Sequence, residues 1–180
     1  MKVLETDLPG VLIIEPQVFG DARGFFLETF QAERYRQDAG ITLPFVQDNH
    51  SRSARGVLRG LHAQGTRPQG KLVRVARGEV FDVAVDINPA SPNCGRWVGV
   101  TLSDSNQRQF WIPPGYAHGF LVLSEIADFE YKCTDYYCPD DEIGIRWDDP
   151  TVGIDWPLSD PVLSDKDRQL PTLNDRRTAQ

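Results

Sequence analysis

The sequence predicts an all-β fold, a sandwich or small barrel with a few short helices. Three observations support this. Nine short segments alternate apolar and polar residues or are rich in β-branched and aromatic ones, turn signals separate them, and only one segment has a convincing helical pattern. The chain has 180 residues, with no internal repeat and no low-complexity linker. We therefore expect a single domain over residues 1–180, long enough to bury a core.

The predicted strands lie at residues 11–15, 24–30, 57–62, 71–75, 80–87, 97–102, 109–112, 119–123 and 129–134. Turns are predicted at residues 19–24, at Arg77-Gly78, at residues 88–93 and at residues 113–115, where glycine, proline and asparagine gather. A helix is predicted over residues 31–39, with Gly40 as its C-terminal cap. The tail after Pro157 is polar, and a short helix is predicted to start near Ser164.

The segment 80–87 has two different faces. One face is apolar and consists of Phe81, Val83, Val85 and Ile87. The other combines two acids with small or apolar residues, namely Val80, Asp82, Ala84 and Asp86. This second face lines a polar barrel interior or faces solvent, and the sequence favours neither interpretation.

Composition excludes several classes of protein. Apolar residues make up 40% and charged residues 25%, which is ordinary for a globular chain and argues against disorder. The net charge of −7 argues against a nucleic-acid-binding protein. No apolar run approaches the length of a membrane span, and the N-terminal segment has no apolar region typical of a secretory signal. We expect a cytoplasmic protein that binds neither nucleic acid nor membrane.

The three cysteines, Cys94, Cys133 and Cys138, are an odd number without zinc-type spacing. The simplest interpretation is thiols in a reducing cytosol, and a disulfide between Cys133 and Cys138 is the less favoured alternative.

Positive charge is concentrated in one stretch of an otherwise acidic chain. Residues 52–77 contain no acid and seven basic side chains: Arg52, Arg55, Arg59, Arg67, Lys71, Arg74 and Arg77. Such a run forms either a solvated surface or a site for a small anion such as a diphosphate. Apolar residues interrupt it at strand-like spacing, which favours some inward-pointing basic side chains, so both interpretations stay open.

The chain has three histidines, His50, His62 and His118. His118 ends a Pro-x-Gly-x-x-His pattern that resembles the second conserved motif of cupins. Their first motif supplies a His-x-His pair and a glutamate as metal ligands, whereas this chain has His62-Ala63-Gln64 at that place. The resemblance therefore implies a cupin barrel without its metal. Isolated histidines are more often structural, but His62 lies between Arg59 and Lys71.

Eight segments, in order along nearly the whole chain, resemble the dTDP-4-dehydrorhamnose 3,5-epimerase family. They are residues 19–28, 45–51, 56–62, 69–74, 78–86, 111–120, 131–137 and 163–167. The resemblance implies a cupin-type jelly roll, a dTDP-linked 4-keto-6-deoxyhexose as substrate and no cofactor. The protons on C3 and C5 of that sugar lie next to the C4 ketone. Removing either gives an enolate, and reprotonation on the opposite face inverts the centre.

The resemblance also assigns the catalytic residues. His62 is the base, and Asp167 is the carboxylate that orients it, much as in a catalytic triad. Lys71 stabilises the enolate oxygen, and Tyr131 is the acid on the opposite face. From the residues alone, Asp167 is an acid in a polar tail and Tyr131 an ordinary strand aromatic.

The resemblance also implies that Arg59 contacts the sugar or the diphosphate. Arg59 and His62 are three residues apart, so a regular strand would direct them to opposite faces. Gly60 between them predicts a bulge that turns both inward.

The remaining family positions concern substrate binding and assembly. The resemblance implies a homodimer that shares N-terminal strands, with a neighbouring subunit contributing Arg23, Phe26 and Glu28. It also implies that Gln47 and Asn49 line the site, that Tyr137 stacks on thymine, and that Asp82 and His118 lie behind the reacting groups. Phe26 is alternatively a buried strand residue.

One departure from the family is visible. Many relatives carry an aromatic residue directly after the catalytic histidine, where this chain has Ala63. Ala63 and the loop at residues 64–69 are expected to affect how the loop packs and how the substrate fits the site. The alternatives are an epimerase acting only at C3 or only at C5 in a natural-product pathway, a 3,4-ketoisomerase, and a non-catalytic sugar-nucleotide-binding cupin. A metal-dependent cupin oxygenase is disfavoured by Gln64.

Overall fold

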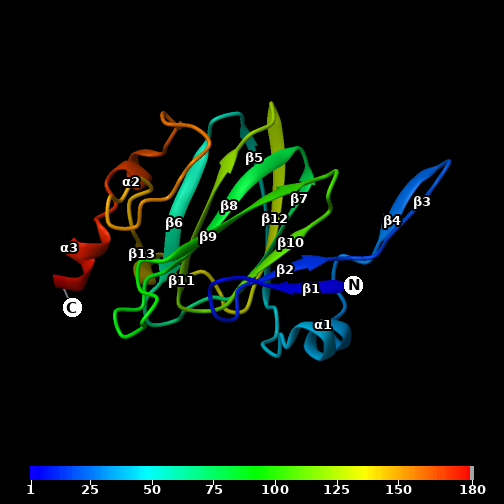
Figure 1. Ribbon diagram of the computed structural model, residues 1–180, viewed down its shortest axis with the longest axis horizontal. Helices are drawn as coiled ribbons and strands as arrows, with labels where there is room; N and C mark the ends of the chain where they lie inside the picture. The colour runs from blue at the N-terminus through cyan, green and yellow to red at the C-terminus, as the bar shows by residue number, and fades with distance from the viewer. Residues whose placement is uncertain (179–180) are drawn as a thin grey trace.

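The computed structural model describes residues 1–178, so the last two residues of the predicted domain lie outside it. Two antiparallel sheets face each other (Figure 1). The larger consists of β1 (Lys2–Glu5), β2 (Leu12–Glu15), β10 (Gln109–Ile112), β7 (Lys71–Arg77), β12 (Ile126–Cys133) and β5 (Gln47–Ala54), in that order. The smaller consists of β13 (Glu142–Gly144), β6 (Leu58–Gln64), β11 (Tyr116–Val122), β8 (Glu79–Asp86) and β9 (Trp97–Ser103). The all-β prediction is confirmed.

All nine predicted strands are present, with ends displaced by up to three residues. Four further strands were not predicted: β1, β5, β13 and β3 (Val18–Asp21). The predicted turn at 19–24 is wrong in part, because β3 pairs with β4 (Gly24–Leu27) and only Ala22 and Arg23 form the turn. β5 escaped prediction because its sequence, Gln-Asp-Asn-His-Ser-Arg-Ser-Ala, is polar on both faces.

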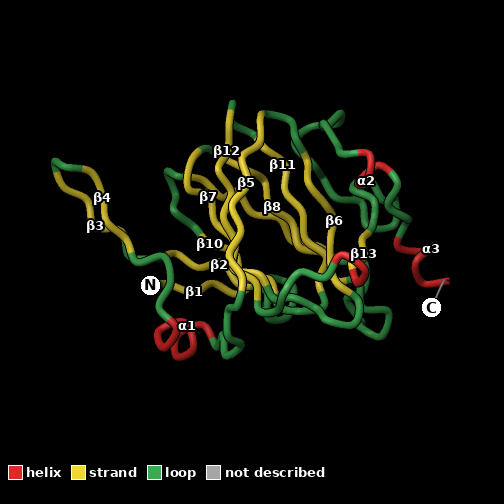
Figure 2. The backbone as a smooth tube through the Cα atoms, turned by 180° about the vertical axis from the view of Figure 1, so that it is seen from behind, coloured by secondary structure: helices red, strands yellow, loops and turns green. Residues whose placement is uncertain are grey.

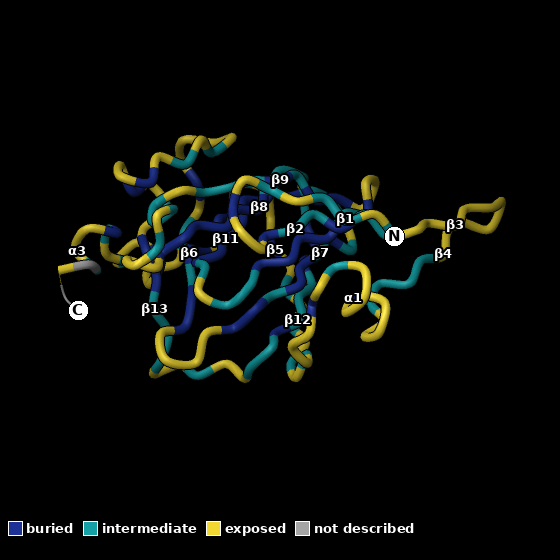
Figure 3. The backbone as a smooth tube through the Cα atoms, turned by 60° about the horizontal axis from the view of Figure 1, so that its bottom comes forward, coloured by how far each residue is buried: buried dark blue, intermediate teal, exposed yellow. Residues whose placement is uncertain are grey.

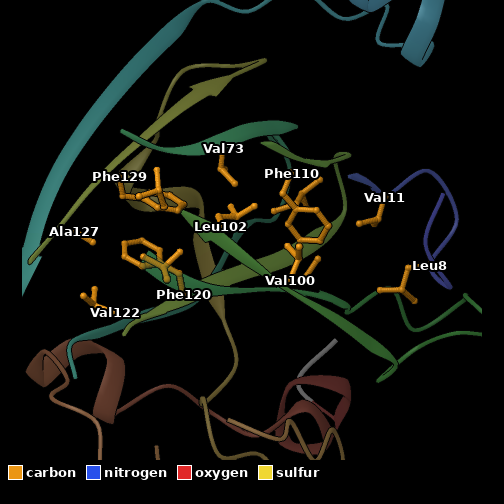
Figure 4. Close-up of a cluster of buried hydrophobic side chains, with 14 residues drawn as sticks. Leu8, Val11, Val73, Val100, Leu102, Phe110, Phe120, Val122, Ala127 and Phe129 are labelled. Atoms are coloured by element: carbon orange, nitrogen blue, oxygen red, sulfur yellow. The ribbon is translucent and has the colours of Figure 1, made fainter. Parts of the chain in front are cut away.

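The main core lies between the sheets (Figure 4). At its centre Phe120 of β11 stacks on Phe129 of β12, with ring centroids 3.9 Å apart. β8 turns Val80, Asp82 and Ala84 toward this interior, and each is fully buried. The interior interpretation of that strand face is therefore confirmed for these residues.

The opposite face of β8 is also covered. Its Val83 and Val85 pack against the C-terminal third of the chain, including Ile145 and Leu173. Figure 2 shows that third beside β6, where β13 pairs with the strand and the short helix α2 (Asp165–Arg168) lies close by. The C-terminal tail therefore lies next to β6 at one end of the smaller sheet.

The helices follow the predicted signals. In α1 (Ala32–Ala39), Gly40 adopts the left-handed conformation of a C-terminal cap, with φ of 67°. Ser164 caps α2 by accepting a hydrogen bond from the backbone N–H of Asp167. A last helix, α3 (Leu173–Thr178), and a 3-10 turn at Pro139–Asp141 complete the described elements.

The hairpin of β3 and β4 projects away from both sheets (Figures 1 and 3). Its aromatic side chains are exposed: Phe19 by 61%, Phe25 by 61% and Phe26 by 70%. Exposed aromatic clusters of this kind mark interaction surfaces. The alternative interpretation of Phe26 as a buried residue is wrong within this chain.

The less favoured alternative, a disulfide between Cys133 and Cys138, is wrong, because both are free thiols in the part of the chain described. Within residues 1–178, no helix is long and apolar enough to cross a membrane.

Candidate active site

A cavity of about 470 Å³ opens between the two sheets. The larger sheet contributes Lys71 and Tyr131 to its lining, and the smaller sheet contributes His62 and His118. A smaller cavity of about 90 Å³ shares His62, Lys71 and Tyr131 with it. The two predicted proton-transfer groups, His62 and Tyr131, therefore come from opposite walls of one space.

A bulge in β6 directs two side chains into the cavity. His62 pairs with His118 and Arg59 with Phe120, so two residues of β6 stand opposite the single Gly119. Both Arg59 and His62 line the cavity. Gly60 has φ of 136°, and a Cβ there would lie 2.6 Å from the Cα of Gly119. The predicted bulge is confirmed, and glycine is the residue its geometry tolerates.

His62 and Asp167 form a short pair, with 2.6 Å between Nε2 and Oδ1. The backbone N–H of Gly60 donates to the other oxygen of Asp167 over 3.4 Å. Burial is the largest single influence on Asp167 and opposes its ionisation, but the hydrogen bond and charge of His62, together with hydrogen bonds from Gly60 and Ser164, hold the pKa of the carboxyl below its usual value. An ionised carboxylate thus contacts the imidazole.

Lys71 and Tyr131 carry the polar groups on the facing wall. Within residues 1–178, neither side chain makes a hydrogen bond or an ion pair. Burial lowers the pKa of Lys71 and raises the pKa of Tyr131. One ammonium and one phenol are therefore available to a ligand.

His118 and Asp82 form a buried pair behind the cavity, 3.0 Å apart. Burial lowers the pKa of His118 and raises the pKa of Asp82, and their contact opposes both shifts. His118 lines the cavity, whereas Asp82 supports it from the interior.

Gln47, Asn49 and Tyr137 meet around the smaller cavity. Gln47 donates to Asn49 over 3.1 Å and accepts a hydrogen bond from the backbone N–H of Tyr137 over 2.9 Å. The Asn49 amide contacts the Cys133 sulfur at 3.7 Å. These three predicted residues are therefore held in one place.

The sequence did not single out Glu142 and Lys166. Their side chains form an ion pair of 2.7 Å, Tyr137 donates its hydroxyl proton to Glu142, and Glu142 lies 3.9 Å from His62. Burial would raise the pKa of Glu142, but the hydrogen bonds from Lys166 and Tyr137 lower it. Lys166 lies beside Asp167 in the last family-like segment, and this is the signal that could have identified it.

Three predicted binding residues lie outside the cavity. Arg23 is at the tip of the projecting hairpin, where it pairs with Asp21 at 2.5 Å. Phe26 is on the same hairpin, and Glu28 follows it, 3.5 Å from Arg34. Their role in a neighbouring subunit's site stays a prediction.

Five of the seven basic residues in the run fall into two groups. Arg52, Arg67 and Arg74 form ion pairs with acidic side chains of the larger sheet and the loop after it. Arg59 and Lys71 line the cavity. The first group fits the interpretation as a charged surface, whereas the anion site stays a prediction, for which Arg59 and Lys71 supply the available positive charge.

The position of a cupin metal ligand is occupied by Gln64. Its amide nitrogen donates to the Arg67 carbonyl over 2.7 Å, and its oxygen accepts from the backbone N–H of Cys138 over 2.7 Å. Among the described residues, no three or more His, Cys, Asp or Glu side chains are grouped as metal ligands. The donor set does not fit the metal site of cupins.

Comparison with known proteins identifies the family. The model of the family described as dTDP-4-dehydrorhamnose 3,5-epimerase matches residues 5–175. The dTDP-4-dehydrorhamnose 3,5-epimerase of Pseudomonas aeruginosa is 58% identical over 170 residues, covering 94% of each chain. The crystal structure of the dTDP-6-deoxy-D-glucose-3,5-epimerase of Legionella pneumophila, in complex with dTDP-4-keto-L-rhamnose, is 59% identical with a TM-score of 0.93 over 96% of this chain and 93% of that one.

A more distant relative has a narrower activity. A 3'-monoepimerase from Streptomyces bikiniensis, in complex with dTDP-quinovose, is 34% identical with a TM-score of 0.91, covering 97% of this chain and 89% of that one. The family-like segments of the sequence, the cavity between the sheets and these comparisons agree: the chain belongs to the dTDP-4-dehydrorhamnose 3,5-epimerase family.

Proposed function

We propose that this chain inverts both C3 and C5 of a dTDP-linked 4-keto-6-deoxyhexose, as a dTDP-4-dehydrorhamnose 3,5-epimerase of dTDP-L-rhamnose biosynthesis. The observation that carries the proposal is the placement of His62 and Tyr131 on opposite walls of one cavity that Lys71 also lines. Inversion requires a base on one face of the sugar and an acid on the other, with positive charge beside the ketone oxygen.

His62 acts first. Ionised Asp167 accepts a hydrogen bond from Nε2, which leaves Nδ1 of the imidazole to accept the proton from C5 or C3. The electron pair of the broken C–H bond moves into the enolate, whose negative oxygen forms from the C4 ketone. The Lys71 ammonium stabilises that oxygen, and this stabilisation is strong because the side chain is half-buried in the cavity wall.

Tyr131 completes the inversion. Its hydroxyl gives a proton to the opposite face of the carbanionic carbon, and the C4 carbonyl forms again. The imidazolium then loses the substrate proton and the phenolate regains one by exchange with solvent, which restores the starting enzyme. The reaction moves protons only, so it requires no cofactor.

The nucleotide lies at the same opening. Gln47 and Asn49 line this end of the site, Tyr137 stacks on the thymine ring, and Arg59 contacts the diphosphate. Glu142 and Lys166 close the rim beside His62.

A second copy of the chain completes the site. The projecting hairpin exposes Phe25 and Phe26 and carries Arg23 away from its own cavity. A homodimer would bury these aromatic rings and place Arg23, Phe26 and Glu28 at the partner's opening. We propose a cytoplasmic location for this dimer, in keeping with Cys133 and Cys138 as free thiols among the described residues.

One alternative has a specific observation in its favour. The similarity to a 3'-monoepimerase over 97% of this chain shows that the fold also supports inversion at a single carbon. The non-catalytic alternative is disfavoured because His62, Asp167, Lys71 and Tyr131 are all present in one cavity or in contact with it.

Exchange in heavy water distinguishes these functions. We expect the protein, incubated with dTDP-4-keto-6-deoxyglucose in deuterium oxide, to incorporate deuterium at both C3 and C5 by NMR. His62→Ala should abolish both signals. Deuterium at one carbon only would replace the proposal by the monoepimerase, and none at either carbon would refute an epimerase.

A further inference from the structure

β5 presents a row of polar side chains to the interior. Gln47, Asn49, Ser51 and Ser53 stand directly opposite Cys133, Tyr131, Phe129 and Ala127 of β12. Residues directly opposite in an antiparallel pair share a face of the sheet. This row therefore lies on the cavity side of the larger sheet, alongside Tyr131.

Three of the four side chains in the row have hydrogen-bond partners. Gln47 bonds Asn49, Asn49 bonds Cys133, and Ser53 accepts a hydrogen bond of 3.0 Å from Nε of Arg59. The hydroxyl of Ser51 is buried and makes no hydrogen bond within residues 1–178, although Ser51 lines the large cavity. A buried hydroxyl without a partner is unfavourable, which indicates that a ligand supplies the partner.

The register of the larger sheet places Ser51 relative to the reacting groups. Lys71 stands opposite Cys133, Tyr131 occupies the next inward-facing row, and Ser51 the row after that. Successive inward rows are about 7 Å apart along the strands. Tyr131 thus stands between the ammonium of Lys71 and the hydroxyl of Ser51.

The ring of the substrate can be oriented on these three points, an argument that rests on the proposed function. With the C4 oxygen at Lys71 and the reacting carbons C3 and C5 at Tyr131, the C1–C2 edge of the ring points to Ser51, because C1 lies across the ring from C4. The C1 substituent is the diphosphate, for which Arg59 is available. The polar group left at this edge is the C2 hydroxyl.

We propose that the Ser51 hydroxyl hydrogen-bonds the C2 hydroxyl of the sugar and makes the site selective for 2-hydroxy over 2-deoxy substrates. Ser51 is a specificity-determining residue in this proposal and takes no part in proton transfer. A site built around such a hydrogen bond discriminates against the analogue that lacks the hydroxyl, because the protein group then stays unpaired.

The test is a cycle of two enzymes and two substrates. kcat/KM is measured for the wild type and Ser51→Ala, with dTDP-4-keto-6-deoxyglucose and its 2-deoxy analogue. We expect the kcat/KM of the wild type to be about tenfold higher for the 2-hydroxy substrate than for the 2-deoxy analogue. Ser51→Ala should lower kcat/KM by about tenfold for the 2-hydroxy substrate alone. The variant should then treat the two substrates within about twofold of each other.

Two matched variants serve as controls. Ser51→Thr keeps a hydroxyl and should keep the discrimination. Ser53→Ala removes the neighbouring hydroxyl, which holds Arg59, and should lower kcat/KM equally on both substrates. Circular dichroism of each variant checks its fold.

The proposal would be overturned by a wild type that shows no preference for the 2-hydroxy substrate. It would also be overturned if Ser51→Ala lowered kcat/KM equally for both substrates, or lowered kcat/KM for neither. An equal loss would indicate contact with the diphosphate or a packing role. These results are distinct from failure of the proposed function, in which the wild type exchanges no deuterium at C3 or C5 of either substrate.

Discussion

At the scale of single residues, the His62–Asp167 pair is the most constrained part of the site. Asp167 is buried, its oxygen lies 2.6 Å from His62, and Ser164 fixes the start of its helix. An amide at this position would keep the shape of the side chain but lose the charge that favours a protonated imidazole.

Asp167→Asn should therefore lower kcat by about a thousandfold or more, with little loss of stability. Asp165→Asn, an exposed acid in the same helix, is the matched control and should keep wild-type activity. Steady-state epimerisation rates and thermal melting measure both. A tenfold or smaller loss in Asp167→Asn would remove Asp167 from the role of partner.

Lys71 illustrates a conflict between stability and activity. Because burial lowers the pKa of Lys71 in the folded protein, the unfolded state binds more protons. The contribution of Lys71 to the free energy of unfolding is therefore least favourable at neutral pH and improves as pH rises toward the ordinary lysine value of 10.5.

Lys71→Met should be inactive yet more stable than the wild type at pH 7, by about 1 kcal/mol. The gain should shrink as pH rises toward 10, as measured by denaturant unfolding. Lys2→Met, at a side chain 68% exposed, should show no such pH-dependent gain. A Lys71→Met variant less stable than the wild type at pH 7 would contradict this account of the buried ammonium.

At the scale of elements, two glycines allow β6 and β11 to approach closely at the bulge. A Cβ on Gly119 would lie 2.7 Å from the Arg59 carbonyl oxygen and 2.9 Å from the Leu61 side chain. Since backbone atoms surround most of this space, a Cβ on Gly119 would force β6 and β11 apart. This would displace His62, which follows Leu61 directly in β6.

Gly119→Ala should lower the free energy of unfolding by about 1–3 kcal/mol and reduce kcat through displacement of His62. Gly20→Ala is the control, because a Cβ there meets its nearest atom at 3.8 Å, and its stability should change by less than about 0.5 kcal/mol. Equal stabilities of the two variants would show that β6 and β11 are not tightly opposed.

The elements also show what the sequence could predict. Strands with one buried face, such as β8, were predicted because apolar residues alternate along them. β5 was missed because it has no apolar face, and β13 because it is only three residues long with a single apolar side chain, Ile143; both border the site. The polar side chains that prevented prediction of β5 include Gln47, Asn49 and Ser51, which line the cavities. Function and low predictability therefore coincide in this strand.

At the scale of the whole molecule, chemistry is assembled from distant parts of the chain. The alternation of side chains along the strands is enough to predict that Lys71 and Tyr131 face the same interior. The contact between His62 and Asp167, however, joins residues 105 positions apart and depends on how the C-terminal tail folds back. Composition and periodicity do not determine that path. The resemblance of residues 163–167 to the family predicts the pairing independently of the geometry.

The projecting hairpin leads to a prediction about assembly. Phe26→Asp should weaken the proposed homodimer, because a charge would replace an exposed ring at the predicted interface. Sedimentation velocity should show a monomer for Phe26→Asp, and a dimer for the wild type and for Leu158→Asp, another exposed apolar position. A monomeric wild type would contradict a shared site.

The central claim is that the two sheets hold a base and an acid on opposite faces of one sugar. The most direct test is the ratio of deuterium exchange to inversion at C5 in Tyr131→Phe, followed by NMR in heavy water. With His62 intact and Tyr131 without its hydroxyl, exchange should continue while inversion falls by at least about a hundredfold. A Tyr131→Phe enzyme that inverts C5 at the wild-type rate would contradict the account.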